Sequence, residues 1–394
     1  MSEWKKVKLK DCCLSISDGD HLPPPKTNNG IPFITISNID STNHIDFSDT
    51  LFVPQDYYDR LDSIRKPQEK DILYSVVGSF GKPVLVKEYK KFVFQRHIAI
   101  LRPNNDIADS RFIYYTMLTR DFYMQADSVA IGAAQRTVSL TALRSMTINL
   151  PPISSQHRIA TILSRYDSLI ENYQKQIKLL EEAARRLYKE WFVDLRFPGH
   201  ENTKIVDGMP EGWEKKKLVD FANVIMGQSP KSEFYNNENK GLPFHQGVGS
   251  YGNRFVVDDT YSTSYTRIAE PHSILFSVRA PVGRLNITKN KIVIGRGLSA
   301  MTHLQGYQSF LFYLLKERFF KDNIIGNGAI FASITKDELL NLEFLIASDD
   351  LIRRFNSLAK NMDDEIMNAD EQIRLLTKAR DRLLPKLMGG EIKV

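Results

Sequence analysis

The sequence predicts an α+β fold in which two related globular α/β modules alternate with two long helices that form an antiparallel coiled coil. Three observations support this prediction: a repeat of about 200 residues, a heptad-patterned segment at the end of each copy, and short β-like runs inside each copy. We expect five parts, which are module 1 at 1–151, a first long helix at 152–197, a linker at 198–211, module 2 at 212–346, and a second long helix with a short tail at 347–394.

The repeat consists of matched motifs that occur in the same order in both halves. Trp4 and Leu9 correspond to Trp213 and Leu218 near the start of each copy. The offset between matched positions is 209 at the first match and 196 at the last, so the loops of the two copies differ in length. The other matches are Gly30–Phe33 with Gly241–Phe244, Asp71–Val76 with Ser273–Val278, Gly81-Lys82 with Gly283-Arg284, Gln95–His97 with Gly295–Gly297, Gly132-Ala133 with Gly328-Ala329, and Thr137–Ser139 with Ser333–Thr335.

Each copy ends in a segment whose seam residues recur at alternating steps of four and three, the spacing of a coiled coil. Ser154-Ser155 and Ser348-Asp349-Asp350 supply N-cap residues. Arg380 is the only polar member of the seam, and we expect it to set register or alignment. The first seam is Tyr166, Ile170, Tyr173, Ile177, Leu180, Ala184, Leu187 and Trp191, and the second is Met362, Ile366, Ala369, Ile373, Leu376, Arg380, Leu383 and Leu387.

Such a seam can pack on its own module, form a homodimer, or pair within the chain. Pairing within the chain is favoured, because tethered segments lose less entropy on association than separate molecules do. A two-fold relation between the copies makes that pair antiparallel.

Inside the modules, short apolar runs broken by Gly, Pro and Asn predict strands, and two longer runs predict helices. The expected strands include Ile31–Ile36, Phe92–Phe94, Ile98–Leu101 and Lys291–Ile294, and the expected helices are Arg111–Arg120 and Ser309–Lys316.

Composition sets the broad class of the protein. The chain has 394 residues, 42% of them hydrophobic and 25% charged, as is ordinary for a globular protein. Its net charge of +6 fits a polyanionic partner without requiring one. Adjacent Cys12 and Cys13 suit neither a disulfide nor a zinc site, which favours a reducing compartment. We expect no secretory signal and no membrane span.

Motifs for catalysis are weak. Gly247–Gly252 matches a dinucleotide-binding string, but a turn and a strand follow it, so we interpret it as a loop. Asn149-Leu150-Pro151-Pro152 resembles an amino-methyltransferase tetrad interrupted by Leu150. Asp71, Glu88 and Lys90 have the spacing of a nuclease metal site, but the second copy lacks the matching residues, so we interpret them as surface charge. We expect this chain itself to bind no metal and no cofactor.

Two similar but non-identical modules joined by stiff helices suit a target in two parts. Duplex DNA is such a target, because positions on one face recur about every 10 bp, or roughly 34 Å.

The chain resembles the specificity subunit of type I restriction–modification systems over its whole length. The resemblance rests on Leu150–Ala160 at the start of the first long helix, Asp207–Trp213 before module 2, and Arg380–Ile392 at the end. Ser155 stands where the family usually has an acidic residue, and Ser348-Asp349-Asp350 replaces a Pro-rich opening. The module interiors match the family weakly, as the family implies, since its modules differ with the target.

The resemblance implies a non-catalytic, cytoplasmic, prokaryotic DNA-binding subunit. Modules 1 and 2 would be target recognition domains that each read one half of an asymmetric bipartite sequence in double-stranded DNA. The two helices would serve as a spacer ruler and as a docking surface for two methyltransferase subunits, which motor-nuclease subunits join. S-adenosylmethionine, ATP and Mg would be used by these partners. A stand-alone metal-dependent nuclease and a non-DNA coiled-coil scaffold are the alternatives.

The repeat also predicts which residues contact DNA. Residues shared by both copies suit phosphate contact or a structural ion pair, and residues that differ at matched positions suit base reading. Arg96 and Arg296, with Lys82 and Arg284, are the phosphate candidates. The base-reading candidates are Thr35 and Ser37 opposite His245 and Gln246, His97 opposite Gly297, Gln135 and Arg136 opposite Phe331, and Arg279 opposite Val77.

Overall fold

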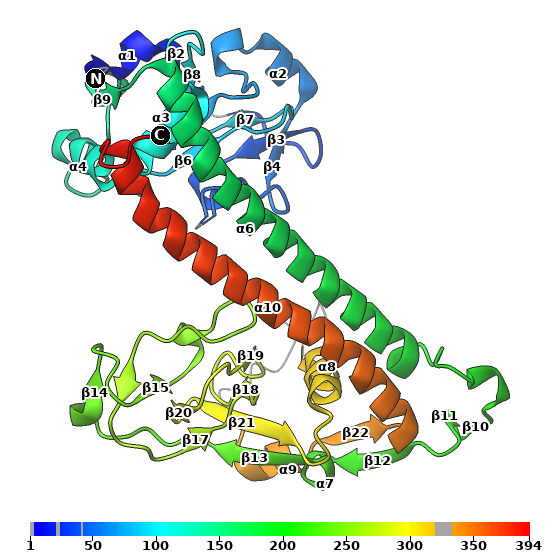
Figure 1. Ribbon diagram of the computed structural model, residues 1–394. Helices are drawn as coiled ribbons and strands as arrows, with labels where there is room; N and C mark the ends of the chain where they lie inside the picture. The colour runs from blue at the N-terminus through cyan, green and yellow to red at the C-terminus, as the bar shows by residue number, and fades with distance from the viewer. Residues whose placement is uncertain (1–3, 21–23, 41, 320–332) are drawn as a thin grey trace. The chain divides into compact units, whose positions relative to one another are not determined.

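The computed structural model describes residues 4–20, 24–40, 42–319 and 333–394 (Figure 1). The chain divides into two compact units, of which unit 1 is Met1–Tyr173 with Gln372–Val394 and unit 2 is Gln174–Glu371. Both long helices cross this division, so each unit holds one module together with part of each helix. Gly328, Ala329 and Phe331 lie outside the described residues.

Module 1 consists of three small sheets and five helices among its described residues. A four-stranded antiparallel sheet has the order β2-β8-β5-β6, a three-stranded sheet has the order β4-β3-β7, and β1 pairs with β9. The elements are β1 (Lys5–Lys8), α1 (Leu9–Cys12), β2 (Cys13–Asp18), β3 (Ile31–Ile34), β4 (Leu51–Val53), α2 (Gln55–Arg60), β5 (Ile72–Ser75), β6 (Pro83–Leu85), β7 (Val93–Phe94), β8 (Ile98–Pro103), α3 (Ser110–Met117), α4 (Arg120–Val129), α5 (Leu140–Ser145) and β9 (Thr147–Leu150).

Module 2 follows the short hairpin of β10 (Ile205–Val206) and β11 (Met209–Pro210). Its sheets have the orders β13-β21-β18-β19 and β14-β16-β15-β20-β17, and β12 pairs with β22. The elements are β12 (Glu214–Lys217), α7 (Leu218–Phe221), β13 (Ala222–Met226), β14 (Tyr235–Asn236), β15 (Leu242–His245), β16 (Tyr261–Ser262), β17 (Ile268–Ala269), β18 (Ile274–Ser277), β19 (Leu285–Ile287), β20 (Ile292–Ile294), β21 (Leu298–His303), α8 (Gln308–Phe319), α9 (Lys336–Leu340) and β22 (Glu343–Ile346).

The two modules share their strand connections, which confirms the predicted α+β fold with two related copies. The four-stranded sheets correspond strand by strand, and the parallel pair β3–β7 corresponds to β15–β20. Single hydrogen bonds recur as well: the Lys82 amide donates to Ser75 Oγ at 2.9 Å, and the matched Arg284 amide donates to Ser277 Oγ at 2.8 Å.

The predicted elements occur with shifted ends. The helix predicted at Arg111–Arg120 is two helices, because α3 ends at Met117 and Thr119 caps α4 by accepting a hydrogen bond from the Phe122 amide at 3.3 Å. The strand predicted at Ile31–Ile36 ends at Ile34, where Thr35 begins a 3₁₀ turn over Ile36–Asn38.

The long helices are α6 (Ile153–Tyr188), continued by a π-helical turn at Lys189–Val193, and α10 (Asp349–Met388). The buried amide of Gln156 fixes the start of α6, since it accepts from the Asp109 amide at 2.9 Å and donates to Pro151 O at 2.8 Å. Asp349 and Asp350 lie in the first turn of α10, where the helix dipole favours negative charge.

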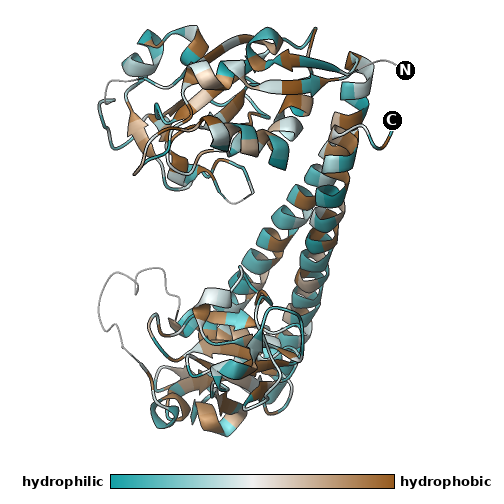
Figure 2. Cartoon of the chain, turned by 90° about the vertical axis from the view of Figure 1, so that its left-hand side faces the viewer, coloured by the Kyte–Doolittle hydropathy of each residue, from teal (hydrophilic) through white to brown (hydrophobic). Residues whose placement is uncertain are grey.

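Every predicted seam residue is buried or half-buried, while most of the long helix surface is hydrophilic (Figure 2). In unit 1, Ile159 and Leu163 near the start of α6 share a core with Leu387 near the end of α10. In unit 2, Ala184 and Tyr188 near the end of α6 share a core with Phe355 near the start of α10. Within each unit, residues of both long helices therefore belong to one core. Antiparallel pairing of the two helices along their length stays a prediction. No helix within the described ranges has the length and apolar character to cross a membrane.

Candidate nucleic-acid interface

The DNA-binding candidates of module 1 lie on four backbone segments that hydrogen bonds bring together, which we call loop cluster 1 (34–37, 75–82, 95–98 and 131–138). The Gln95 amide donates to Ile34 O, and the Val76 amide donates to His97 O, both at 2.9 Å. The Gly78 amide donates to Arg136 O at 2.9 Å. All the candidates of module 1 therefore belong to one region.

Loop cluster 2 (245–247, 277–284, 295–298 and 333–334) repeats this arrangement in module 2. The Gly295 amide donates to His245 O at 2.8 Å, and the Val278 amide donates to Gly297 O at 2.9 Å. The Ile334 amide joins the last segment of the cluster by donating a hydrogen bond to Val278 O at 2.9 Å. In module 1 the Val138 amide donates the matching hydrogen bond to Val76 O. The positions matched in sequence therefore occupy matched places in the fold.

Several candidates are exposed on these clusters. Arg96, Arg279 and Arg296 have exposed side chains with no ion pair to any residue that the structure describes. Gln246, Gln135 and Arg284 are also exposed, and Lys82 is half-buried. His97 is half-buried, and its Nδ1 lies 2.9 Å from the side-chain Nε2 of Gln95. Burial and the neighbouring Arg96 lower the pKa of His97. These side chains are positioned to meet a ligand at the surface, and their contact with DNA stays a prediction.

The prediction that His245 reads a base is corrected by its position in module 2. Its side chain is 0% exposed, with Nδ1 2.8 Å from Ser250 Oγ and Nε2 3.0 Å from Asp258 Oδ1. A buried imidazole with both nitrogens bonded has no atom available for a base, so we assign His245 to the packing of module 2. The sequence did not indicate this, because Asp258 lies in a loop whose pairing no local pattern predicts.

Three other candidates of module 1 have partners inside the module. Arg136, a base-reading candidate, forms an ion pair with Asp127 at 2.5 Å and lies over the Phe80 ring at 5.5 Å from its centroid, so its guanidinium is already engaged inside module 1. Thr35 and Ser37 hydroxyls lie 2.7 Å apart at the start of the 3₁₀ turn. Ser37 is nevertheless exposed.

The nuclease interpretation of Asp71 is not supported by its surroundings. Asp71 is 1% exposed, so its interpretation as surface charge is wrong. It forms a bidentate pair with Arg102, whose Nε and Nη2 lie 3.0 and 2.8 Å from the two carboxylate oxygens. Lys90 lies over the Phe47 ring at 3.5 Å. No group of three or more His, Cys, Asp or Glu side chains in the described part of the chain could hold a metal ion.

Sequence reasoning missed two matched glycines that support the loop clusters. A Cβ on Gly19 would lie 2.2 Å from Phe94 O, and a Cβ on Gly227 would lie 2.1 Å from Gly295 O. Only glycine permits so close an approach to the segment that carries Arg96 or Arg296. A comparison of the two copies could have identified these glycines, because they occupy matched positions in the repeat.

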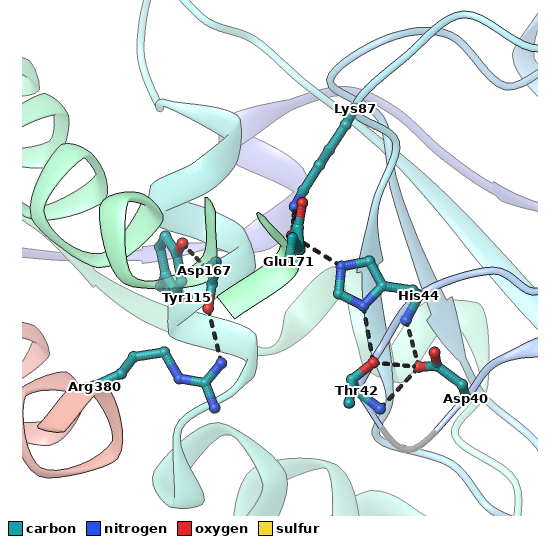
Figure 3. Close-up of polar contacts among 8 residues, drawn as sticks. All are labelled: Asp40, Thr42, His44, Lys87, Tyr115, Asp167, Glu171 and Arg380. Atoms are coloured by element: carbon teal, nitrogen blue, oxygen red, sulfur yellow. Dashed lines mark hydrogen bonds and ion pairs between the residues drawn. The ribbon is translucent and has the colours of Figure 1, made fainter. Parts of the chain in front are cut away.

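Each module is also attached to a long helix by polar contacts. In unit 1, the Tyr115 hydroxyl of α3 donates to Asp167 of α6 at 2.5 Å, and Lys87 forms an ion pair with Glu171 of α6 (Figure 3). His44 Nε2 lies 3.0 Å from the same Glu171 carboxylate. We call Tyr115, Lys87, Asp167 and Glu171 the module 1 seat.

The charge state of Glu171 follows from these contacts. Burial alone would raise its pKa, but the hydrogen bonds from His44 and Lys87 outweigh burial and lower the pKa to about 2. The carboxylate therefore stays ionised through the neutral range and holds both partners.

Similar contacts attach module 2 to α10, although Asp370 does not stand at the position that matches Glu171. The Tyr313 hydroxyl of α8 donates to Asp363 at 2.9 Å, and Lys289 forms an ion pair with Asp370. We call Tyr313, Lys289, Asp363 and Asp370 the module 2 seat. Arg254, which is 5% exposed, also reaches this seat, with Nη2 2.5 Å from Asp363 and Nη1 3.0 Å from Glu181 of α6.

Arg380, the polar seam residue that we expect to set the register of the helices, forms an ion pair across the seam. Its Nη1 lies 2.8 Å from Asp167 Oδ1, so this ion pair joins α10 to α6 inside unit 1 (Figure 3). Burial would lower the arginine pKa, but the hydrogen bonds to Asp167 and Asp381 outweigh it and raise the pKa. A charged member of an otherwise apolar seam disfavours other registers, since a shift would leave it unpaired.

Comparison with known proteins identifies the family. A family model described as type I restriction modification DNA specificity domain matches residues 1–182 and 210–348. The putative type I restriction enzyme MjaX specificity subunit of Methanocaldococcus jannaschii is 30% identical over 404 residues, covering 100% of this chain and 94% of that protein. The type I restriction enzyme HindI specificity subunit of Haemophilus influenzae is 22% identical over 479 residues, covering 100% of both chains.

A solved structure shares the fold. The S subunit of a type I restriction–modification system from M. genitalium matches with a TM-score of 0.65 at 17% identity, covering 98% of this chain and 96% of that one. The duplicated modules, the long helices and the family match over most of the sequence lead to one conclusion: the chain belongs to the type I restriction–modification DNA specificity family.

Proposed function

We propose that this chain gives a type I restriction–modification complex its sequence specificity by reading an asymmetric bipartite DNA target, with one module on each half-site. The observation that carries the proposal is the pair of loop clusters, which share one backbone framework but present different side chains at matched places. Exposed Arg279 occupies the position of Val77, and His97 occupies the position of Gly297. Two copies of one scaffold with different surfaces suit two different half-sites.

We further propose that the long helices set the separation of the half-sites and carry two methyltransferase subunits, which motor-nuclease subunits join. In this proposal the chain does no chemistry of its own. Methyl transfer from S-adenosylmethionine, and cleavage that uses ATP and Mg, are assigned to the partners. The family match supports this division of labour.

The test is co-expression of the tagged chain with a type I methyltransferase subunit from the same host, followed by methylome mapping of the host DNA. We expect co-purification of the two proteins and methylation at one split, asymmetric motif. The methyltransferase expressed alone is the control, and it should leave that motif unmethylated. A methylation pattern that does not depend on this chain would contradict the proposal.

DNA binding by the purified complex distinguishes the coiled-coil scaffold alternative. A DNA-binding complex should lose affinity steeply as salt rises, because phosphate contacts release counterions. A scaffold without DNA function should show no salt-dependent binding to the mapped duplex.

A further inference from the structure

The two seats recur in copies that otherwise differ in their loops. Asp167 and Asp363 stand 196 positions apart, the same offset as the two seams, and each accepts a hydrogen bond from a tyrosine on the module helix that packs beside it. Lys87 and Lys289 each follow the short last strand of a four-stranded sheet, β6 or β19. Both pair with a carboxylate on the long helix that follows their own module.

Each seat joins a module to one face of a helix at two points. Asp167 and Glu171 are four residues apart, and Asp363 and Asp370 are seven apart, so both pairs project from one side of their helix. The two attachments come from different parts of the module, an α-helix and a sheet edge. The apolar core that each helix shares with its module also holds the two together. Two polar points on one helix face add a constraint on the angle of the module about the helix.

The tyrosine–aspartate half of each seat is partly removed from water, which strengthens it, whereas the Lys87–Glu171 and Lys289–Asp370 pairs are more exposed. Tyr115 and Tyr313 are 2% and 1% exposed, and the Asp167 and Asp363 side chains are 13% and 17% exposed. Hydrogen bonds to an ionised carboxylate are stronger than neutral ones, and low exposure reduces screening by salt.

The cation that completes each seat has a different source. In unit 1, Arg380 on α10 pairs with Asp167, whereas the matched seam position on α6 is Ala184. In unit 2, Arg254 from module 2 takes this role and bonds to α6 and α10 together. Module 2 is therefore held to both helices through one buried guanidinium.

We propose that the two seats set the angle of each recognition module on its helix, and thereby limit the spacer length that the assembly accepts between half-sites. This inference rests on the proposed function. It makes the seat residues positioning residues for specificity, with no contact to DNA of their own.

The experiment measures methylation by the purified complex of the chain with its methyltransferase. The substrates are duplexes that carry the mapped half-sites with the native spacer, or with one base pair more or less. The variants are Lys87→Met, Tyr115→Phe and Lys289→Asp, and the matched control is Lys360→Met, which removes an exposed ion pair to Asp364 within α10. The readout is the methylation rate on altered spacers relative to the native spacer.

We expect this ratio to rise by at least about 5-fold in the seat variants, the lower end of a typical coupling between sites, and to stay unchanged in Lys360→Met. Adding Asp370→Lys to Lys289→Asp exchanges the two charges and should restore the native ratio. Melting temperatures identify any variant that fails to fold; the milder Tyr115→Phe and Lys87→Met then decide the question.

Equal loss of methylation on all three spacers would overturn the inference, because it would make the seats purely structural. A wild-type complex that methylates no split motif, or shows no spacer preference, would instead contradict the proposed function.

Discussion

At the scale of single residues, exposure and pairing separate the DNA-binding candidates. Arg279 is exposed, has no ion pair within the described residues and occupies a position where the other module has Val77. His245 came from the same comparison of copies but is buried and bonded. The sequence could show which positions differ, but it could not show which way each side chain points.

Replacement of Arg279 by Ala should weaken binding of the complex to its target by roughly 1–3 kcal/mol if the guanidinium contacts a base. Binding to non-specific duplex should change much less. Titration of both duplexes with wild-type and variant complex measures the difference. Unchanged affinity for the target would remove Arg279 from the interface.

His303 predicts a pH dependence of stability. Burial lowers its pKa to about 4, against a weaker opposing effect of Asp349, and its Nδ1 accepts a hydrogen bond from the Gln305 amide at 3.1 Å. The folded state therefore binds this proton less readily than the unfolded state, whose histidine titrates near 6.5. The stabilising contribution is complete above pH 6.5 and is lost as the pH falls toward 4, by about 3 kcal/mol at most.

Thermal unfolding of wild type and His303→Phe at pH 7 and pH 5 checks this expectation. The wild type should lose more stability than the variant over this interval. An equal loss in both proteins would mean that other groups dominate.

At the scale of elements, the sequence predicted the helices better than the sheets. The heptad steps located α6 and α10, because alternating steps of four and three sustained along a whole segment are typical of a coiled coil. The strands were located only roughly, and their pairing was not predicted. The pairing of β1 with β9 joins residues at the two ends of module 1, such as Lys5 with Leu150, which no local pattern can show.

The seats were missed for a related reason. Asp167 and Glu171 lie among many charged residues on α6, and their partners come from distant parts of the chain. Comparison of the two copies offered the available signal, since a Tyr and a Lys recur at matched module positions and an Asp recurs at a matched helix position. Arg380 was predicted to matter because it interrupts an apolar seam.

Ile177 tests the seam of α6. It is half-buried, so Ile177→Asp places a charge where the helix packs, with an expected loss of roughly 3 kcal/mol of stability. Leu179→Asp is the control, because Leu179 is 57% exposed on the same helix. Circular dichroism melts and co-purification with the methyltransferase should separate the two variants. Equal melting temperatures and equal co-purification of the two variants would contradict the prediction that Ile177 packs in the seam.

At the scale of the whole molecule, the duplication predicts that helix length controls target geometry. Insertion of one heptad in both long helices adds seven residues, or roughly 10 Å of helix, which corresponds to about three base pairs of B-DNA. The methylated motif should then have a spacer longer by about that amount. Methylome mapping of the variant measures the spacer length. An unchanged spacer would show that the helices do not set the separation of the half-sites.

The pairing of first and last strands has an evolutionary consequence. Because β1 runs antiparallel to β9 and β12 runs antiparallel to β22, the polypeptide enters and leaves each module through adjacent strands. A gene segment between those strands can therefore be exchanged as a cassette without breaking the surrounding helices. Under the proposed function, recombination at the two borders would change the half-site that one module reads in a single event, while the two long helices stay the same.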